Sequence, residues 1–385
     1  MFNLTLKWLL VTPAVAAVLL IASAPAGASP SGPGTAAPHT ASSPNPTSVT
    51  NATSVTMTSH LPDRADTDTD TDSDVTPPGP PDPVFPQVTG DAAIVVDRDS
   101  GAVLGAKNAD LRWAPASTTK MMTALLAIEA INAGEISLYS RVVVQADVDI
   151  EPGSGDVGLA PGDNVSVRDL LYMSLVTSAN DAAVALGTYV GGSRDAFIAM
   201  MNTRARQLGL DDTSYVDIAG RDPEDLNNDG RLPAHENCHG NDFLEPACAH
   251  YSTVRDLAAL ARVALDDPLF AQIVNTDCWT PFSWLDQSSG LWPHPTLTNT
   301  NNLIRDGSAD YFDGAYGVKT GTTDRAGSNL VSAAERLVCE CDTDSDGYTH
   351  RDVIAVVVGS ADNGTSTGDR FSDSRALLEF GLSSG

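Results

Sequence analysis

The chain has 385 residues, 42% of them hydrophobic, which is enough to bury one large core or two small ones. Its 22 lysine and arginine residues stand against 50 aspartate and glutamate residues, a formal net charge of −28 at pH 7. Because such a surface repels nucleic acids and anionic membranes, polyanionic partners are excluded from the expected function.

The N-terminal segment, residues 1–28, has the pattern of a secretory signal peptide. A single basic residue, Lys7, precedes an apolar run that begins at Trp8, and small residues follow the run. The run is short for a membrane span and Pro13 interrupts it, so a retained membrane anchor is the less favoured alternative. We therefore expect an exported protein of the periplasm, cell wall or extracellular space, with membrane contact only if this segment is retained.

A linker follows over residues 29–84. It is rich in Ser, Thr, Pro and Asp, and its aspartates alternate with threonine or serine over residues 66–74. This composition offers almost nothing to bury, so it predicts a disordered, self-repelling tether, with loose calcium binding by the aspartates as the alternative. Residues 85–385 are expected to form the folded domain.

Hydrophobic periodicity predicts strands at both ends of this domain and helices between them. Strands contributed by both ends favour one sheet with a helical insert, an α/β fold of the α+β type. The pattern predicts a hairpin at 93–104, helices at 117–131, 167–175, 180–190, 194–208 and 254–265, strands at 328–333 and 353–358, and a closing helix at 372–380.

Ser117 and Lys120 are the first pair of residues with catalytic potential. The serine opens a predicted helix, and the lysine follows three residues later on the same face. A serine hydroxyl needs an adjacent base to become a nucleophile, and a lysine can be that base once burial or a neighbouring cation lowers its pKa. Alone, the spacing favours a simpler explanation, an N-cap serine followed by a solvent-facing lysine.

Two later motifs support the catalytic interpretation. Thr-Ser-Ala-Asn-Asp at 177–181 lies between two predicted helices, where a loop presents Ser178 and Asn180 side by side. Gly-Val-Lys-Thr-Gly-Thr-Thr at 317–323 opens a predicted strand and adds Lys319, with a glycine that lets backbone approach a ligand. A helix cap and a turn with an exposed lysine explain either motif alone, but all three in this order in an exported chain favour one active site.

The set Ser-x-x-Lys, Ser-x-Asn and Lys-Thr-Gly is that of penicillin-binding proteins and class A β-lactamases. Within that superfamily the chain resembles the D-alanyl-D-alanine carboxypeptidases of the peptidase S11 type. The likeness runs from Ala92 to Phe380 and includes His-Tyr-Ser-Thr at 250–253 and Asn-Thr-Asn at 299–301. It implies a penicillin-binding, β-lactamase-like fold, an antiparallel sheet flanked by helices plus an all-helical subdomain, with the active site in the cleft between them.

The resemblance also implies catalytic roles in removing the terminal D-alanine from peptidoglycan stem pentapeptides. Ser117 would attack the carbonyl of the penultimate D-alanine, with Lys120 as its base. Ser178 would relay the proton to the leaving amine, while Asn180 and Lys319 hold the network and lower the pKa of Lys120. No cofactor is implied for catalysis, and β-lactams would act as covalent inhibitors.

The implied substrate-binding residues are Thr320, Gly321 and Thr322. Thr320 would bind the terminal carboxylate of the stem peptide. The backbone N–H groups of Thr322 and Ser117 would form the oxyanion hole.

Alternatives share parts of this chemistry. A class A-like β-lactamase needs a further carboxylate to activate the deacylating water, and no Glu-x-x-Leu-Asn motif lies between Asn180 and Lys319. A transpeptidase or endopeptidase differs only in the acceptor or the bond cut, and the sequence does not separate them. A catalytically inactive, calcium-stabilised wall-binding protein is disfavoured because the motif set is complete.

The chain departs from the family pattern in two acidic insertions, near 221–250 and 339–352, and it ends soon after the closing helix, so the tail domain of many relatives is expected to be missing. The first insertion fits the calcium loop D-x-N-x-D-G-x5-E at every specified position, while the second lacks the final glutamate. Calcium is expected as a structural ion, with plain polar turns as the alternative. The predicted ligands are Asp225, Asn227, Asp229 and Glu236 in the first loop and Asp342, Asp344 and Asp346 in the second.

The five cysteines belong to a chain bound for an oxidising compartment, where disulfides persist. Cys238 and Cys248 are the preferred pair. Cys339 and Cys341 are too close in an extended strand to bond easily to each other, so one of them is expected to reach Cys278 and to leave an odd thiol.

Overall fold

The computed structural model describes residues 84–145, 148, 155–222, 249–285, 295–339, 348–361 and 369–384. The chain divides into two units, Met1–Val75 and Thr76–Gly385, and every described residue belongs to the second. The predicted signal peptide, the tether up to residue 83, Cys238, Cys248, Cys341 and all seven predicted calcium ligands lie outside the described residues. These features stay predictions.

A five-stranded antiparallel sheet forms the centre of the domain, in the order β2-β1-β9-β8-β7. The strands β1 (Ala92–Asp97) and β2 (Val103–Lys107) come from the start of the domain. The strands β7 (Ala315–Thr323), β8 (Gly327–Cys339) and β9 (Tyr348–Ser360) come from its end. The predicted sheet built from both ends of the domain is confirmed.

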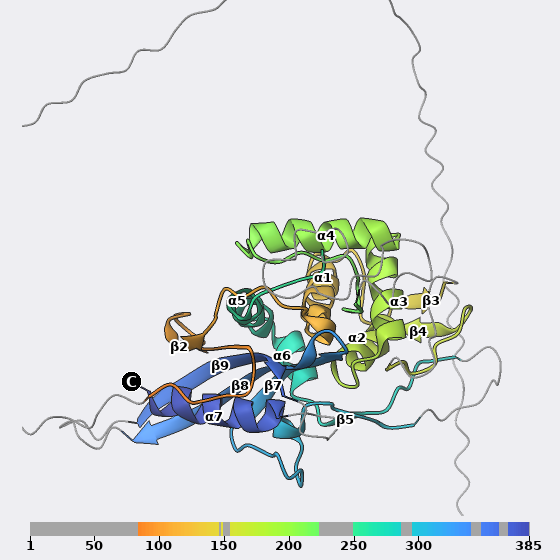
Figure 1. Ribbon diagram of the computed structural model, residues 1–385. Helices are drawn as coiled ribbons and strands as arrows, with labels where there is room; N and C mark the ends of the chain where they lie inside the picture. Colours follow the sequence, from red (N-terminus) through yellow and green to blue (C-terminus); the bar gives the residue numbers. More distant parts are fainter. Residues whose placement is uncertain are drawn as a thin grey trace, which may run out of the picture. The chain divides into compact units, whose positions relative to one another are not determined.

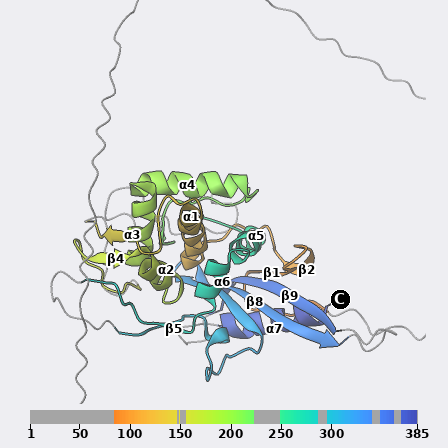
Figure 2. The ribbon, with the colours of Figure 1, turned by 180° about the vertical axis from the view of Figure 1, so that it is seen from behind.

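Helices cover both faces of this sheet, which is why its inner strands are apolar on both sides (Figures 1 and 2). One face carries α7 (Arg370–Ser383). The other carries α5 (Val254–Leu265) and α6 (Pro268–Val274), and both views place these two helices between the sheet and α4. Along β1, Val95 packs in the core under α7, and Ile94 packs in the larger core shared with the helices.

The helical part is organised around α1, which contacts α2, α3, α4, α5 and α6. Almost every residue of α1 is buried, because a helix surrounded by others is apolar on all sides. No helix among the described residues combines the length and apolar character needed to cross a bilayer. The four helices of this part are α1 (Lys120–Asn132), α2 (Val167–Leu175), α3 (Asn180–Gly191) and α4 (Arg194–Gln207).

Local sequence explains where these helices begin. The side chain of Ser166 accepts a hydrogen bond from the Asp169 N–H at the start of α2, and Thr253 does the same for the Asp256 N–H at the start of α5. In both cases the acidic residue also lies in the first turn, where the helix dipole favours a negative charge.

The structure differs from the sequence predictions in its small elements. The helix expected at 117–131 begins at Lys120, because a 3-10 turn precedes it. Neither α6 nor the two small sheets were predicted. These sheets pair β3 (Arg141–Val143) with β4 (Asn164–Ser166) and β5 (Cys278–Trp279) with β6 (Leu297–Thr298), and a second 3-10 turn, η5, covers Asn302–Ile304.

The predicted disulfide to Cys278 is wrong. Cys278 carries a free, exposed thiol. Its backbone lies opposite Thr298 in the small β5–β6 sheet. Cys339, in contrast, ends β8 in the separate five-stranded sheet. Spacing along the sequence contained no information about this separation.

One buried carboxylate, Asp373, ties α7 to the edge of the domain. It accepts hydrogen bonds from the N–H groups of Thr89 (3.0 Å) and Gly90 (3.1 Å) and from the hydroxyls of Thr89 (2.7 Å) and Ser360 (2.8 Å). These partners precede β1 and end β9. Asp373 therefore fixes the helix against both strands.

We expect Asp373→Ala to lower the free energy of unfolding by about 2–4 kcal/mol, because buried donors lose their acceptor. Urea unfolding measures this. The matched control on the same helix is Glu379→Ala, which removes an exposed ion pair with Arg336 and should cost less than about 1 kcal/mol. Equal losses in the two variants would contradict the role assigned to Asp373.

Candidate active site

Ser117 lies in a strained 3-10 turn, η1 (Ala116–Thr119), directly before α1. Ala116 has a φ of +48°, a left-handed conformation that costs a non-glycine residue about 1–2 kcal/mol. Gly220 packs so closely on this turn that a Cβ atom added to it would lie 1.9 Å from the Ala116 carbonyl oxygen. Packing therefore holds the serine in a conformation that the isolated turn would not favour.

Lys120 is fully buried beneath the serine, with three acceptors around its Nζ atom. Nζ lies 2.8 Å from Ser117 Oγ, 2.6 Å from Asn180 Oδ1 and 2.8 Å from the Ala219 carbonyl oxygen. An amide oxygen and a carbonyl oxygen can only accept, so they take two hydrogens of Nζ. In the neutral amine, the lone pair is then left to accept the hydroxyl hydrogen of Ser117.

The surroundings of Lys120 lower its pKa toward neutrality. Burial lowers its pKa to about 7, opposed by the carboxylates of Asp217 and Asp156 and assisted by the cation of Arg221. From the sequence, either burial or a neighbouring cation was expected to lower this pKa, and the resemblance implied Asn180 and Lys319. Of these, burial is the largest cause.

Strand β7 brings Lys319 to the same place. Its side chain is buried, and Nζ donates a hydrogen bond to the Thr320 carbonyl oxygen at 3.0 Å. Burial lowers the pKa of Lys319 well below its usual value, and the charges of Lys120 and Arg370 lower it further. The two lysines therefore belong to one electrostatic site.

The backbone of β7 meets the serine turn at Gly321. A Cβ atom added there would lie 3.0 Å from the Pro115 carbonyl oxygen and 3.2 Å from the Ser117 nitrogen. Next to it, the hydroxyl of buried Thr320 lies 2.6 Å from that of Thr300, while Thr322 is exposed. A side chain at Gly321 would therefore be tight, because the strand or the serine turn would have to shift to make room for it.

The second motif is brought only partly into the site. Asn180 begins α3 and bonds Lys120, as described above. Ser178 lies between α2 and α3 with a φ of +66°, the left-handed region again. Among the contacts of the described residues, its hydroxyl makes no hydrogen bond to Lys120 or Lys319.

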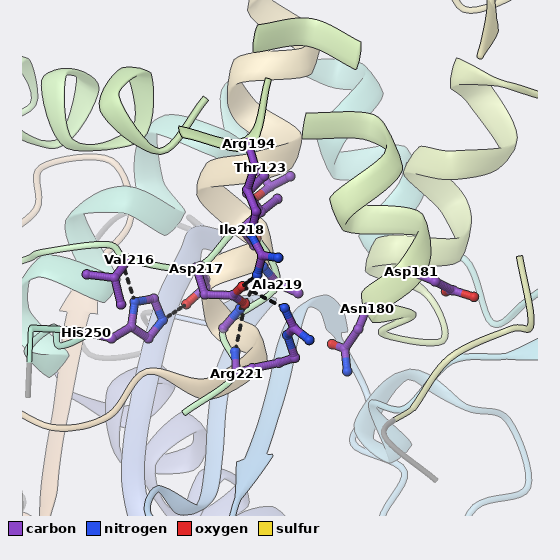
Figure 3. A network of polar contacts seen from close by, with 12 residues as sticks. Thr123, Asn180, Asp181, Arg194, Val216, Asp217, Ile218, Ala219, Arg221 and His250 are labelled. Atoms are coloured by element: carbon purple, nitrogen blue, oxygen red, sulfur yellow. Dashed lines mark hydrogen bonds and ion pairs between the residues drawn. The ribbon is translucent and has the colours of Figure 1, made fainter. Parts of the chain in front are cut away.

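A buried carboxylate, Asp217, escaped the sequence analysis (Figure 3). Its Oδ2 accepts from Arg194 at 2.5 Å and from Arg221 at 3.4 Å. Burial opposes its ionisation, but these two arginines and backbone N–H groups hold its pKa below the usual value. Arg194 was the available signal, because a cation at the first position of a helix is disfavoured by the helix dipole unless an anion neutralises it.

Arg370 was also missed. It begins α7, is buried, and donates from Nη1 to the carbonyl oxygens of Gly321 (2.9 Å) and Asn329 (3.3 Å). Burial lowers its pKa to about 10, so it stays charged at neutral pH. The site thus holds a fixed cation behind β7.

The part of the chain that the structure describes contains no group of three or more His, Cys, Asp or Glu side chains suited to a metal ion. The predicted calcium ligands all fall outside that part. Around Lys120 Nζ, the described residues supply a hydroxyl, an amide oxygen and a backbone carbonyl oxygen.

Comparison with known proteins decides the family. A family model described as D-alanyl-D-alanine carboxypeptidase, peptidase S11, matches residues 78–343. The chain belongs to this family. Its structure resembles that of the Streptomyces K15 DD-transpeptidase, with a TM-score of 0.59 and 28% identity over 78% of this chain and 99% of that one. The expected superfamily and fold class are confirmed.

Peptidase S11 relatives from two bacteria show how much of the chain is shared. The D-alanyl-D-alanine carboxypeptidase DacF of Bacillus subtilis is 31% identical over 245 residues, 64% of this chain and 54% of that protein. DacC of Escherichia coli is 32% identical over 302 residues, 77% of this chain and 62% of that protein. The chain thus spans between half and two thirds of the length of these relatives.

The contact between Gly220 and the serine turn can be tested by comparing two glycines. We expect Gly220→Ala to be less stable to thermal unfolding than Gly209→Ala, by on the order of 1–3 kcal/mol. Both glycines have positive φ, +90° and +71°, but only Gly220 has atoms within 4 Å of the added Cβ. Equal destabilisation would mean that the turn is not held by this contact.

Proposed function

We propose that this S11 family member is a serine-type D-alanyl-D-alanine carboxypeptidase, which removes the terminal D-alanine from peptidoglycan stem pentapeptides through an acyl-enzyme on Ser117. The observation that carries the proposal is the contact between Ser117 Oγ and the buried Lys120 Nζ, at 2.8 Å. With a pKa of about 7, roughly half of the lysine is a neutral base at neutral pH.

Acylation starts within this pair. The Lys120 amine takes the hydroxyl proton while Ser117 Oγ bonds to the carbonyl carbon of the penultimate D-alanine. The carbonyl electron pair moves to oxygen, where the N–H groups of Ser117 and Thr322 stabilise it. The C–N bond then breaks, and Ser178 relays the proton from the Lys120 ammonium to the leaving D-alanine. Water hydrolyses the ester, with Lys120 again as base, and restores Ser117.

The groups around β7 favour a substrate that ends in a carboxylate. Arg370 keeps its positive charge there, and the amine of Lys319 and the hydroxyl of Thr320 are hydrogen-bond donors. A stem peptide offers such a carboxylate at its C-terminal D-alanine, and β-lactams carry one as well. We therefore propose stem peptides as substrates and β-lactams as covalent inhibitors. Because stem peptides lie outside the cytoplasm, the proposed location is the cell envelope, in keeping with the predicted signal peptide.

Transfer of the acyl group to an amine is the second candidate. It is favoured by one observation, that the similar solved structure carries the name DD-transpeptidase. The first half-reaction is the same, and the acceptor that resolves the acyl-enzyme is an amine in place of water. Adding an amino acid acceptor to the assay separates the two, since transfer yields a new peptide of altered mass.

The assay that tests the proposed activity measures D-alanine released from a stem pentapeptide. The wild-type chain should release it, and Ser117→Ala should reduce the rate by about a thousandfold or more, since the nucleophile is lost. Binding of a fluorescent penicillin gives an independent readout, with stable labelling of the wild type and none of Ser117→Ala. Wild-type protein that releases no D-alanine would overturn the carboxypeptidase proposal, and rapid steady hydrolysis of the penicillin would favour a β-lactamase.

We also propose that calcium binds the acidic loops as a structural ion. The loop with Asp225, Asn227, Asp229 and Glu236 supports this, because it supplies hard oxygen ligands at the spacing of known calcium loops, and Asp342, Asp344 and Asp346 repeat it in part. Catalysis needs no metal in the mechanism above.

Removal of calcium by a chelator is therefore expected to lower the melting temperature and to leave D-alanine release in place. Glu236→Gln should reproduce the lower melting temperature without chelator, since it weakens the bidentate ligand. A melting temperature that is the same with calcium and with chelator would contradict the calcium proposal.

A further inference from the structure

The backbone turn from Asp217 to Arg221 is folded around a single carboxylate oxygen. Oδ1 of Asp217 accepts hydrogen bonds from the N–H groups of Ala219 (2.9 Å), Gly220 (2.8 Å) and Arg221 (2.9 Å). Figure 3 shows this carboxylate at the centre of the polar cluster. Three backbone groups that point at one atom leave the turn little freedom.

The outer side of the same turn is bonded to the helix that carries the base. The Ala219 carbonyl oxygen accepts from Lys120 Nζ at 2.8 Å, and the Ile218 carbonyl oxygen accepts from Thr123 Oγ1 at 2.7 Å. One peptide unit therefore separates the carboxylate of Asp217 from the amine of Lys120.

A buried histidine holds the start of the turn. His250 Nδ1 accepts from the Val216 N–H at 3.1 Å, so Nε2 carries the hydrogen and donates to Thr119 Oγ1, also at 3.1 Å. Burial lowers the pKa of His250 to about 4, so the ring is neutral at physiological pH and keeps this arrangement. His250 thereby links the Asp217–Arg221 turn to η1, in addition to the contacts of that turn with α1.

We propose that Asp217 is a positioning residue for Lys120: its carboxylate shapes the turn so that the Ala219 carbonyl stays on Nζ, and its negative charge acts on the same amine. This rests on the proposed function, in which Lys120 is the base. Without the Ala219 acceptor, Nζ would be free to turn away from Ser117, and its lone pair would no longer be aimed at the hydroxyl.

The charges that face Lys120 predict the sign of the effect. Asp217, Asp156 and Asp181 favour the ammonium form, while Arg221 disfavours it and Lys319 repels it. Of these, Asp217 is the strongest opponent of the burial that lowers the pKa of Lys120. Replacing Asp217 by a neutral residue should therefore lower that pKa, and replacing Arg221 should raise it.

The test is the pH dependence of the second-order rate constant for acylation by a fluorescent penicillin, measured on the full chain. In the wild type, the rate should rise with pH through about 7 as Lys120 becomes neutral. In Asp217→Asn, the plateau rate should fall by roughly tenfold to a hundredfold through misplacement of the base. The midpoint should also move to lower pH, by on the order of one unit.

Two further variants separate positioning from a general loss of stability. Asp373→Asn alters another buried carboxylate that binds backbone N–H groups, but on α7, so it should lower the melting temperature and leave the pH midpoint unchanged. Arg221→Met leaves Asp217 paired with Arg194 and should move the midpoint to higher pH, opposite to Asp217→Asn. Arg221→Met also tests the proposal by itself if Asp217→Asn does not fold.

The outcomes are distinguishable. Opposite shifts in Asp217→Asn and Arg221→Met support the proposal. If the plateau rate falls in Asp217→Asn but the midpoint stays at the wild-type pH, as the midpoint of Asp373→Asn should, then Asp217 is merely structural and the proposal is overturned. An unshifted midpoint in Arg221→Met would overturn it as well. Wild-type protein that is never acylated would instead refute the proposed function itself.

Discussion

The burial of one amine, Lys120, is the constraint on which the rest of the structure depends. An ammonium group without water is costly unless its hydrogens are bonded, and a lysine that kept its usual pKa would be no base at neutral pH. The fold meets both conditions with acceptors from Ser117, Asn180 and Ala219. These acceptors come from three separate parts of the chain, so the surroundings of Lys120 are complete only when the helices and the turn before residue 222 are all in place.

Strain and close packing give this site its precision. Among the described residues, three that are not glycine have positive φ, and two of them, Ala116 and Ser178, lie in the predicted catalytic motifs. Such conformations persist only where neighbours over-determine them. For Ala116 these neighbours include Gly220, which has no room for a Cβ atom against η1, and Gly321, where a Cβ atom would be tight. The turn that carries Ser117 is therefore held in place by contacts with the backbone of Gly220 and Gly321.

Sequence predicted the parts of this arrangement that are local. Periodicity located the main helices and the sheet, because a buried helix face and a covered strand leave their pattern in any window of residues. The motif spacing also predicted that Ser117 and Lys120 are neighbours, and Ser117 Oγ lies 2.8 Å from Lys120 Nζ. What it missed depends on distant partners: the Asp217 cluster joins α4 to a turn, and Arg370 reaches β7 from the last helix. Cys278 has a free thiol and lies in a different sheet from Cys339. A single aspartate or cysteine has no sequence pattern that reveals what it will face.

The balance of charge around the site runs against that of the whole chain. The chain carries a net charge of −28, yet the buried guanidinium of Arg370 keeps its positive charge against β7. At physiological ionic strength, exposed charges are screened beyond about 8 Å, while buried charges are screened much less. A carboxylate arriving at β7 therefore experiences the nearby buried cation of Arg370 more strongly than the distant acidic surface. The buried acidic groups near Lys120, Asp217 above all, act against the effect of burial. They limit how far burial lowers the pKa of Lys120 and so keep that pKa near 7.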